Sequence, residues 1–392
     1  MLFSLALIFL CGMGLGSLFQ KLKLPALLGM LLTGILLGPS VLNLLDGSIL
    51  AVSADLRRIA LIIILTRAGL NLDLADLKKV GRPAVLLCFV PASFEILGAL
   101  VLAPRLLGLS LTEAAVLGAV IAAVSPAVVV PKMLKLMDEG YGTRQSIPQM
   151  ILAGASVDDV FVIVLFTSFT GLAAGEGVAA LDFAKIPTSI VLGVAGGVAC
   201  GWVLAELFRR VHMRDSAKVV LLLSTSFLLV TLEDALPGPV GFSGLLAVMA
   251  MGIALQYRRG QVAARLSQKY AKLWVAAELL LFVLVGAAVD VGAAAETGLA
   301  AVGLIFGALC FRMVGVLVCT LGTRLTGRER LFCMLAYTPK ATVQAAIGSV
   351  PLAMGLACGQ TVLAVAVLAI LITAPLGSVA IESTYRRLLQ KE

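Results

Sequence analysis

The sequence VSPAVVVP occupies residues 124–131 of this chain, and YTPKATVQ occupies residues 337–344. Both stretches lie inside long apolar segments. Proline removes a backbone hydrogen-bond donor and clashes with the preceding helical turn, so Pro126, Pro131 and Pro339 are expected to break two helices. Unpaired backbone groups in apolar surroundings are tolerated where they line a cavity or face protein, which makes both breaks candidates for a functional site. Two ordinary proline kinks would give the same pattern.

The apolar segments around these breaks are typical of membrane-spanning helices. Of the 392 residues, 60% are hydrophobic and only 13% are charged, whereas soluble domains have roughly half and a quarter. A bilayer core of about 30 Å needs roughly 20 apolar helical residues. We therefore predict one all-α integral membrane domain over residues 1–392, with about 13 transmembrane helices. The expected spans are 2–19, 25–43, 57–71, 83–103, 112–131, 146–173, 187–208, 217–233, 240–256, 273–290, 298–320, 331–353 and 360–381.

The basic residues alternate from one connection to the next. Most of the 30 Lys and Arg residues, Lys23, Lys78 and Lys79 among them, follow odd-numbered spans, whereas the opposite connections hold Arg57, Arg58, Arg105 and Lys185. This positive-inside asymmetry predicts a multi-pass protein of the cell membrane with its N-terminus outside and its C-terminus in the cytoplasm. It also explains the net charge of +8 without a nucleic-acid partner. The basic stretch 258–272 could instead form an amphipathic helix on anionic lipid.

The two breaks are expected at matching positions of an internal repeat. They are seven spans apart, and an odd separation gives the two halves opposite orientations in the membrane. This indicates inverted-topology repeats, with spans 1–6 matching spans 8–13 and the seventh span as a link. Broken helices related in this way are expected to cross at the bilayer midplane and to form a substrate site.

Five charged side chains are expected near mid-membrane depth. They are Glu95 in span 4, Asp158 and Asp159 in span 6, Arg312 in span 11 and Lys340 in span 12. Charges at this depth cost several kcal/mol and usually face a partner or an internal cavity. Because spans 4 and 11 are repeat partners, Glu95 and Arg312 could meet, as a structural ion pair. The same argument brings Lys340 within reach of Asp158 or Asp159.

The adjacent carboxylates of Asp158 and Asp159 predict a site that cations and protons share. Neighbouring carboxylates in a low-dielectric cavity repel each other and are poorly solvated, so at least one is expected to hold a proton near the working pH. Once protons leave, the carboxylate oxygens can bind a small hard cation. This competition gives exchange directly, with Lys340 as a removable counter-charge. The sequence therefore favours a secondary antiporter that exchanges a small monovalent cation for H⁺ and has no cofactor.

Other classes of function fit the residues less well. A pump driven by ATP would need a phosphate-binding loop of the form GxxxxGKS or GxxxxGKT, which does not occur in the sequence. Intramembrane proteases use aspartates on facing helices or a buried histidine, whereas Asp158 and Asp159 are adjacent and His212 lies in a basic connection. We therefore expect no catalytic residue and no enzymatic activity. A K⁺/H⁺ antiporter, a cation channel and a same-fold symporter of organic solutes stay open as alternatives.

Four stretches of the chain resemble one family. Residues 140–142 (GYG) through 155–159 (ASVDD) resemble the aspartate-pair region of NHA-type sodium/proton antiporters, which belong to the cation/proton antiporter superfamily. Residues 118–131 and 339–349 look like the two broken helices of that family, and residues 24–39 are similar to the superfamily's second helix. The motifs are spread over nearly the whole chain, and their joint order makes the resemblance specific.

The resemblance implies an NhaA-like fold, exchange of Na⁺ or Li⁺ for H⁺, and a homodimer embedded in membrane lipid. In such proteins a core part moves against a dimerisation part. By resemblance the core part is 83–173 and 298–381, the dimerisation part is 1–80 and 217–290, and 187–208 is a linker helix.

The resemblance also implies roles for individual residues. Asp158 and Asp159 hold the cation, with Asp159 the more directly essential, and Ser125 near the first break completes the cation site. Lys340 pairs with Asp158 and takes part in proton coupling. Glu95 and Arg312, the two remaining buried charges, form an ion pair found in NHA-type members.

Overall fold

A computed structural model describes residues 1–22, 24–71, 81–174, 180–235 and 242–391 of the chain. Within these ranges the backbone is almost entirely α-helical, and the one extended pairing is an isolated bridge between Tyr141 and Lys391. Each expected span coincides with a helix or with a group of consecutive helices. Lys23, Lys78 and Lys79 of the predicted charge alternation lie outside the described residues.

The chain divides into two compact units. Unit 1 comprises Met1–Ala54, Ala75–Val162 and Leu279–Glu392, and unit 2 comprises Asp55–Leu74 and Ile163–Glu278. All the buried charges singled out above belong to unit 1. The division reflects packing within one chain, so the expected dimerisation part, core part and linker helix stay a prediction.

The described helices follow one another with short connections. Unit 1 holds α1 (Leu2–Lys21), α2 (Ala26–Leu37), α3 (Gly47–Ala51), α6 (Arg82–Leu87), α7 (Val90–Leu107), α8 (Leu111–Ala122), α9 (Pro126–Asp138), α15 (Val291–Thr320), α16 (Gly327–Ala336), α17 (Thr342–Ile347), α18 (Val350–Ala353) and α19 (Gly359–Leu388). Unit 2 holds nearly all of α4 (Ser53–Asn71), with α11 (Ala180–Arg210), α12 (Asp215–Ala235) and α13 (Gly244–Arg258). Two further helices are divided between the units, α10 (Ile147–Ala174) and α14 (Gly260–Ala287).

Eight helices of the described chain are long and apolar enough to cross a bilayer. They cover Leu2–Lys21, Arg82–Leu107, Ile147–Ala174, Ile190–Arg210, Asp215–Glu233, Gly260–Ala287, Gly298–Thr320 and Gly359–Leu388. Shorter apolar helices cover Ala26–Leu37, Leu111–Ala122, Gly244–Arg258 and Thr342–Ala353. The expected third span is α4, which carries Arg57, Arg58 and Arg67 and is outside both sets. The prediction of an all-α membrane protein is confirmed.

The two predicted breaks are present, with one correction. Helix α8 ends at Ala122, the backbone is extended through Ser125, and α9 begins at Pro126, where the missing N–H group costs no helical bond. The second break separates α16 from α17 and contains Pro339. The expectation that Pro131 also breaks a helix is wrong, because this residue lies inside α9. It follows the start of α9 by only five residues, so a single backbone bond is lost and the helix continues.

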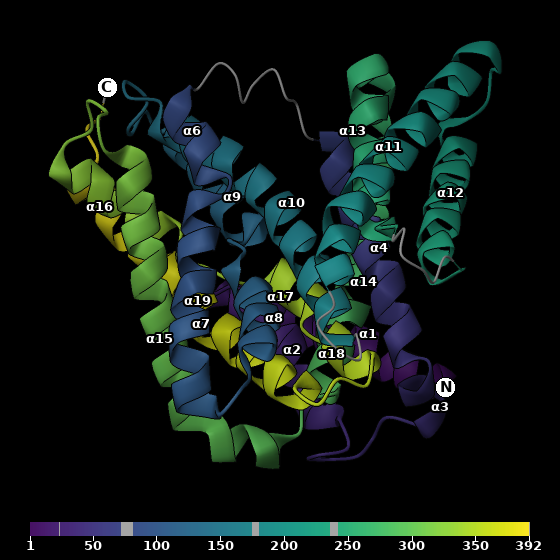
Figure 1. Cartoon of the computed structure of the whole chain (residues 1–392), viewed down its shortest axis with the longest axis horizontal. Helices are drawn as coiled ribbons and strands as arrows, with labels where there is room; N and C mark the ends of the chain where they lie inside the picture. Colours follow the sequence, from purple (N-terminus) through teal and green to yellow (C-terminus); the bar gives the residue numbers. More distant parts are fainter. Residues whose placement is uncertain (23, 72–80, 175–179, 236–241, 392) are drawn as a thin grey trace. The chain divides into compact units, whose positions relative to one another are not determined.

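The two breaks contact each other directly. The Ser125 N–H group donates a hydrogen bond of 2.8 Å to the Pro339 carbonyl oxygen. Gln344 at the start of α17 donates from Nε2 to the Ala123 carbonyl oxygen at 2.7 Å, while its Oε1 accepts from the Ala341 N–H group at 2.8 Å. Helices α8 and α17 accordingly contact each other and both contact α19, and they lie side by side in Figure 1. Backbone groups freed by one break are thus satisfied by the other.

Matching caps support the internal repeat. The first broken span begins with a capping box in which Ser110 and Glu113 each bond the other's backbone N–H group. The second begins with the same motif, formed by Thr326 and Glu329. In both spans the sequence S/T-x-x-E begins at the residue directly before the helix and ends at the third helical residue, a signal readable from the sequence alone.

Close approach of α7 and α15 brings two buried charges together. A Cβ atom on Gly315 of α15 would lie 2.9 Å from the Pro91 Cα atom of α7. A Cβ atom on Gly98 of α7 would lie 2.9 Å from the ring of Phe311 on α15. Small residues on both helices therefore bring the two backbones close at the level of Glu95 and Arg312.

Candidate functional site

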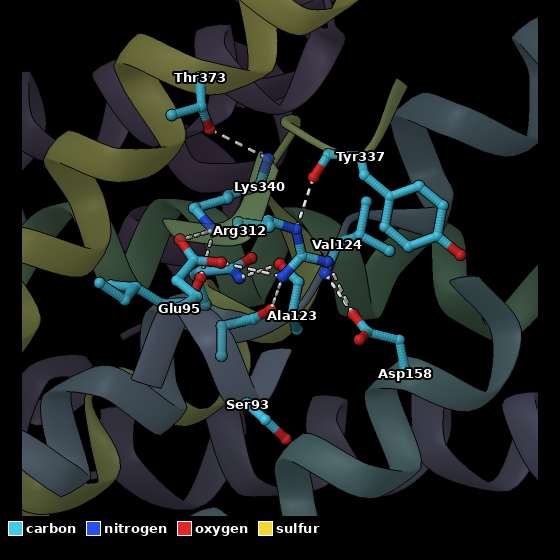
Figure 2. Close-up of polar contacts among 12 residues, drawn as sticks. Ser93, Glu95, Ala123, Val124, Asp158, Arg312, Tyr337, Lys340 and Thr373 are labelled. Atoms are coloured by element: carbon cyan, nitrogen blue, oxygen red, sulfur yellow. Dashed lines mark hydrogen bonds and ion pairs between the residues drawn. The ribbon is translucent and has the colours of Figure 1, made fainter. Parts of the chain in front are cut away.

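Arg312 lies at the centre of the buried polar network. Its side chain is fully buried, and Nη1 lies 2.9 Å from Glu95 Oε2 on α7. On the opposite side Nη2 lies 3.2 Å from Asp158 Oδ2 on α10 (Figure 2). One planar guanidinium group therefore bridges two buried carboxylates, as its fork of donors allows.

Arg312 also binds the backbone of both breaks. Nε donates to the Tyr337 carbonyl oxygen at 2.7 Å, at the end of α16. Nη1 donates to the Ala122 carbonyl oxygen, at the end of α8. These last carbonyls have no helical partner of their own, so the cation satisfies groups that the breaks leave exposed.

Lys340 pairs with Glu95 in this structure. Its Nζ atom lies 2.5 Å from Glu95 Oε1 and donates to the Ile121 carbonyl oxygen at 2.5 Å. The backbone N–H group of Lys340 donates to Thr373 Oγ1 of α19 at 3.0 Å, which anchors the second break. The expected pairing of Lys340 with Asp158 is therefore not the one found.

Lys340 does not pair with Asp158 because Arg312 already makes that ion pair. Asp158 Oδ2 accepts from Arg312 and from the Val124 N–H group, at 2.7 Å for the latter. Lys340 carries a compact ammonium group, and it lies with Glu95 on the other side of the guanidinium group (Figure 2). Glu95 and Asp158 are thus balanced by Arg312 and Lys340, two charges of each sign.

Asp159 is the unbalanced carboxylate. Within the described residues no ion pair reaches it, and its buried Oδ1 atom has no hydrogen-bond partner. The Oδ1 atom of Asp158 and the hydroxyl oxygen of Ser125 are likewise buried and without a partner in the described chain. Ser125 stands at the N-cap position of α9 and makes no capping bond with its side chain. Buried oxygens without partners are rare in folded proteins and require an explanation.

The structure thus brings together Glu95, Arg312, Lys340 and Asp158 in one hydrogen-bonded network. Sequence reasoning missed Tyr337, Gln344 and Thr373, which hold the network through backbone and side-chain bonds. Tyr337 and Gln344 belong to the proline-interrupted stretch itself, so their position beside the break was the available signal. Thr373 offered none, because a threonine inside an apolar helix usually bonds its own helix, as it also does here with Ala369.

Comparison with known proteins agrees with this architecture. The family described as sodium/hydrogen exchanger, transmembrane, matches residues 5–386 of the chain. The chain belongs to that family. This exchanger is 36% identical over 415 residues to sodium/hydrogen exchanger 9B2 of Homo sapiens, covering 100% of this chain and 75% of the human protein. It is 32% identical over 402 residues to human sodium/hydrogen exchanger 9B1, covering 96% and 76%.

A solved structure shows the same fold. The sodium proton antiporter MjNhaP1 from Methanocaldococcus jannaschii, determined at pH 8, superposes with a TM-score of 0.82. The match covers 98% of this exchanger and 97% of that chain at 20% identity. This exchanger therefore has the fold of that antiporter, as the sequence predicted.

Proposed function

We propose that this exchanger is a secondary active antiporter that moves Na⁺ or Li⁺ against H⁺ by alternating access. Membership of the sodium/hydrogen exchanger family supports the substrates, and the names of its relatives agree with them. The observation that carries the proposal is the adjacent pair Asp158 and Asp159, each with a buried carboxylate oxygen that lacks a partner in the described chain. Carboxylate and hydroxyl oxygens suit small hard cations.

The charge balance indicates how cation and proton compete. Because Arg312 and Lys340 already compensate Glu95 and Asp158, a charged Asp159 leaves the buried site one negative charge in excess. A proton or a monovalent cation removes that excess, and both at once would overcharge the site. Sodium that binds the free oxygens of Asp158, Asp159 and Ser125 therefore displaces a proton from the pair.

Lys340 takes part in proton coupling through Glu95 in this proposal. If its ammonium group lost a proton, Arg312 would be the one cation of the described chain left in contact with both Glu95 and Asp158, and the site would gain one uncompensated negative charge. A Lys340 that opens from Glu95 would also release the Ile121 carbonyl oxygen at the end of α8. Protonation of Lys340 is therefore linked to the first break.

The membrane arrangement completes the proposal. The alternation of basic residues supports a cell-membrane protein with its N-terminus outside and its C-terminus cytoplasmic. The proposed homodimer uses residues 1–80 and 217–290, while 83–173 and 298–381 move, and 187–208 is the linker helix. Membrane lipid surrounds the dimer.

The experiment is exchange in proteoliposomes that contain a pH-sensitive dye and hold an imposed proton gradient. We expect dequenching on addition of sodium or lithium chloride, and none with Asp159→Asn. Asp46→Asn is a matched control, because Asp46 caps α3 by accepting from the Ser48 N–H group and asparagine caps equally well. Full exchange by Asp159→Asn would overturn the site. A response to potassium alone, or conduction without proton coupling, would overturn the proposed function.

A further inference from the structure

The hydroxyl group of Tyr337 is buried and without a partner, although the rest of this residue is firmly held. Its side chain is 1% exposed, and its Oη atom makes no hydrogen bond within the described chain. The backbone carbonyl oxygen accepts from Arg312 Nε, and the guanidinium carbon of Arg312 lies 5.5 Å from the centre of the ring. Arg312 therefore contacts both the backbone and the ring of Tyr337, and these contacts fix the position of the hydroxyl group.

A glycine on α10 makes room for this hydroxyl. A Cβ atom on Gly154 would lie 2.1 Å from Tyr337 Oη, so the hydroxyl oxygen contacts the α10 backbone itself. Gly154 precedes Asp158 by four residues, which is about one helical turn of 5.4 Å on the same face. The ring of Tyr337 and the side chain of Asp158 also lie on the same side of Arg312 (Figure 2). The Tyr337 hydroxyl thus lies against α10, about one turn before Asp158 on the face that carries Asp158.

Folding alone does not account for this oxygen. A buried hydroxyl without a hydrogen bond lowers stability, and phenylalanine would fill the same space without that cost. Five other side-chain oxygens of the described part of unit 1 are buried without a hydrogen bond. Glu95 Oε1 has its ion pair with Lys340, and Gln149 Oε1 lies elsewhere on α10. The remaining three, Ser125 Oγ, Asp158 Oδ1 and Asp159 Oδ1, are the oxygens of the proposed cation site. Tyr337 therefore shares with them burial, the absence of a partner and a position beside the breaks.

We propose that the Tyr337 hydroxyl oxygen is a further ligand of the transported cation and sets the affinity for it. This inference rests on the proposed function. A phenol oxygen offers a lone pair and no charge, so it strengthens cation binding without changing the charge balance of the site. Its loss should weaken sodium binding while the number of protons exchanged per sodium stays the same.

The test is the half-saturating sodium concentration of Tyr337→Phe in the proteoliposome assay. We expect an increase of about three- to tenfold, the effect of one lost neutral contact. The maximal rate, the ratio of protons to sodium and the melting temperature should not fall. If the variant transports nothing, sodium-dependent stabilisation of the purified protein replaces transport as the readout: its loss supports the inference, and its retention overturns it.

Tyr270→Phe is the matched control, since this tyrosine of unit 2 is also buried but its hydroxyl lies 3.5 Å from the Val219 carbonyl oxygen. It should leave half-saturation unchanged. Gly154→Ala should raise the half-saturating sodium concentration, as Tyr337→Phe does. It should lower the melting temperature of the wild type more than that of the Tyr337→Phe variant, in which the clash with the hydroxyl is absent.

An unchanged half-saturating concentration in an active Tyr337→Phe variant would overturn this inference while leaving the antiporter proposal intact. A lower melting temperature with unchanged half-saturation would show a structural role and overturn it too. So would a shifted pH profile with unchanged sodium affinity, because the hydroxyl would then act on the carboxylate proton. Full exchange by Asp159→Asn would instead remove the proposed function on which the inference rests.

Discussion

The ion pair between Lys340 and Glu95 leads to a prediction that distinguishes the structure from the pairing expected with Asp158. Lys340→Met removes one of the two cations that contact Glu95 and leaves Arg312 on the other oxygen. Breaking a buried ion pair by deleting one partner costs about 3–5 kcal/mol. Because Glu95 keeps its ion pair with Arg312, we expect Lys340→Met to lower the free energy of unfolding by an amount at or below the lower end of this range.

The pairing itself is measured by double-mutant cycles. Groups in direct contact within one network couple by about 0.5–3 kcal/mol. We expect Lys340→Met combined with Glu95→Gln to couple near the top of that range, because each single change leaves the other charge without its contact at 2.5 Å. Lys340→Met combined with Asp158→Asn should couple by less than half as much, since Arg312 stands between them in the network.

The assay is thermal unfolding in one detergent and lipid mixture at one scan rate, because melting temperatures of such proteins depend on rate. Arg312→Met serves as the positive control and should couple to both Glu95→Gln and Asp158→Asn. Equal or stronger coupling of Lys340 to Asp158 than to Glu95 would refute the network as described.

Three further changes test separate parts of the structure. Gly315→Ala should lower the free energy of unfolding by about 1–3 kcal/mol, because its Cβ atom would meet the Pro91 backbone. Gly303→Ala on the same helix is the control: its Cβ atom would meet only a side-chain atom at 3.9 Å, so thermal unfolding should be unchanged. Ser125→Ala should leave the melting temperature unchanged, because the hydroxyl has no partner in the described chain, and should raise the half-saturating sodium concentration. Thr326→Ala removes the cap of the second broken span and should cost about 1 kcal/mol in the same unfolding assay.

Hydropathy and proline placement were sufficient to predict the helices and both breaks. Apolar length determines where a helix can cross a bilayer, and a proline inside an apolar segment marks where it unwinds. Pro131 shows the limit of this argument, because a proline near the start of a helix forfeits one bond and need not end it.

Pairing among the buried charges was only partly predictable. Sequence position gives the depth of a residue along its helix, which was enough to expect Glu95 near Arg312. It gives neither the rotation of each helix nor the reach of each cation. The guanidinium fork of Arg312 spans Glu95 and Asp158, and that reach leaves Lys340 with the second oxygen of Glu95.

Residues that contribute to the site through their backbone carbonyl groups could not be predicted from the sequence either. The carbonyl oxygens of Ile121, Ala122 and Tyr337 accept from the buried cations only because the helices end there. Their side-chain identity carries no trace of this role. Tyr337 was visible as part of the second break, but the position of its hydroxyl depends on Gly154, more than 180 residues earlier in the chain.

The central claim is that sodium and protons compete for one buried carboxylate pair. Addition of sodium to purified protein in a weakly buffered solution measures this competition as proton release. We expect the wild type to release protons on adding sodium and Asp159→Asn to release none, with both proteins folded by thermal unfolding. Sodium binding without proton release, or equal release from the variant, would contradict the account.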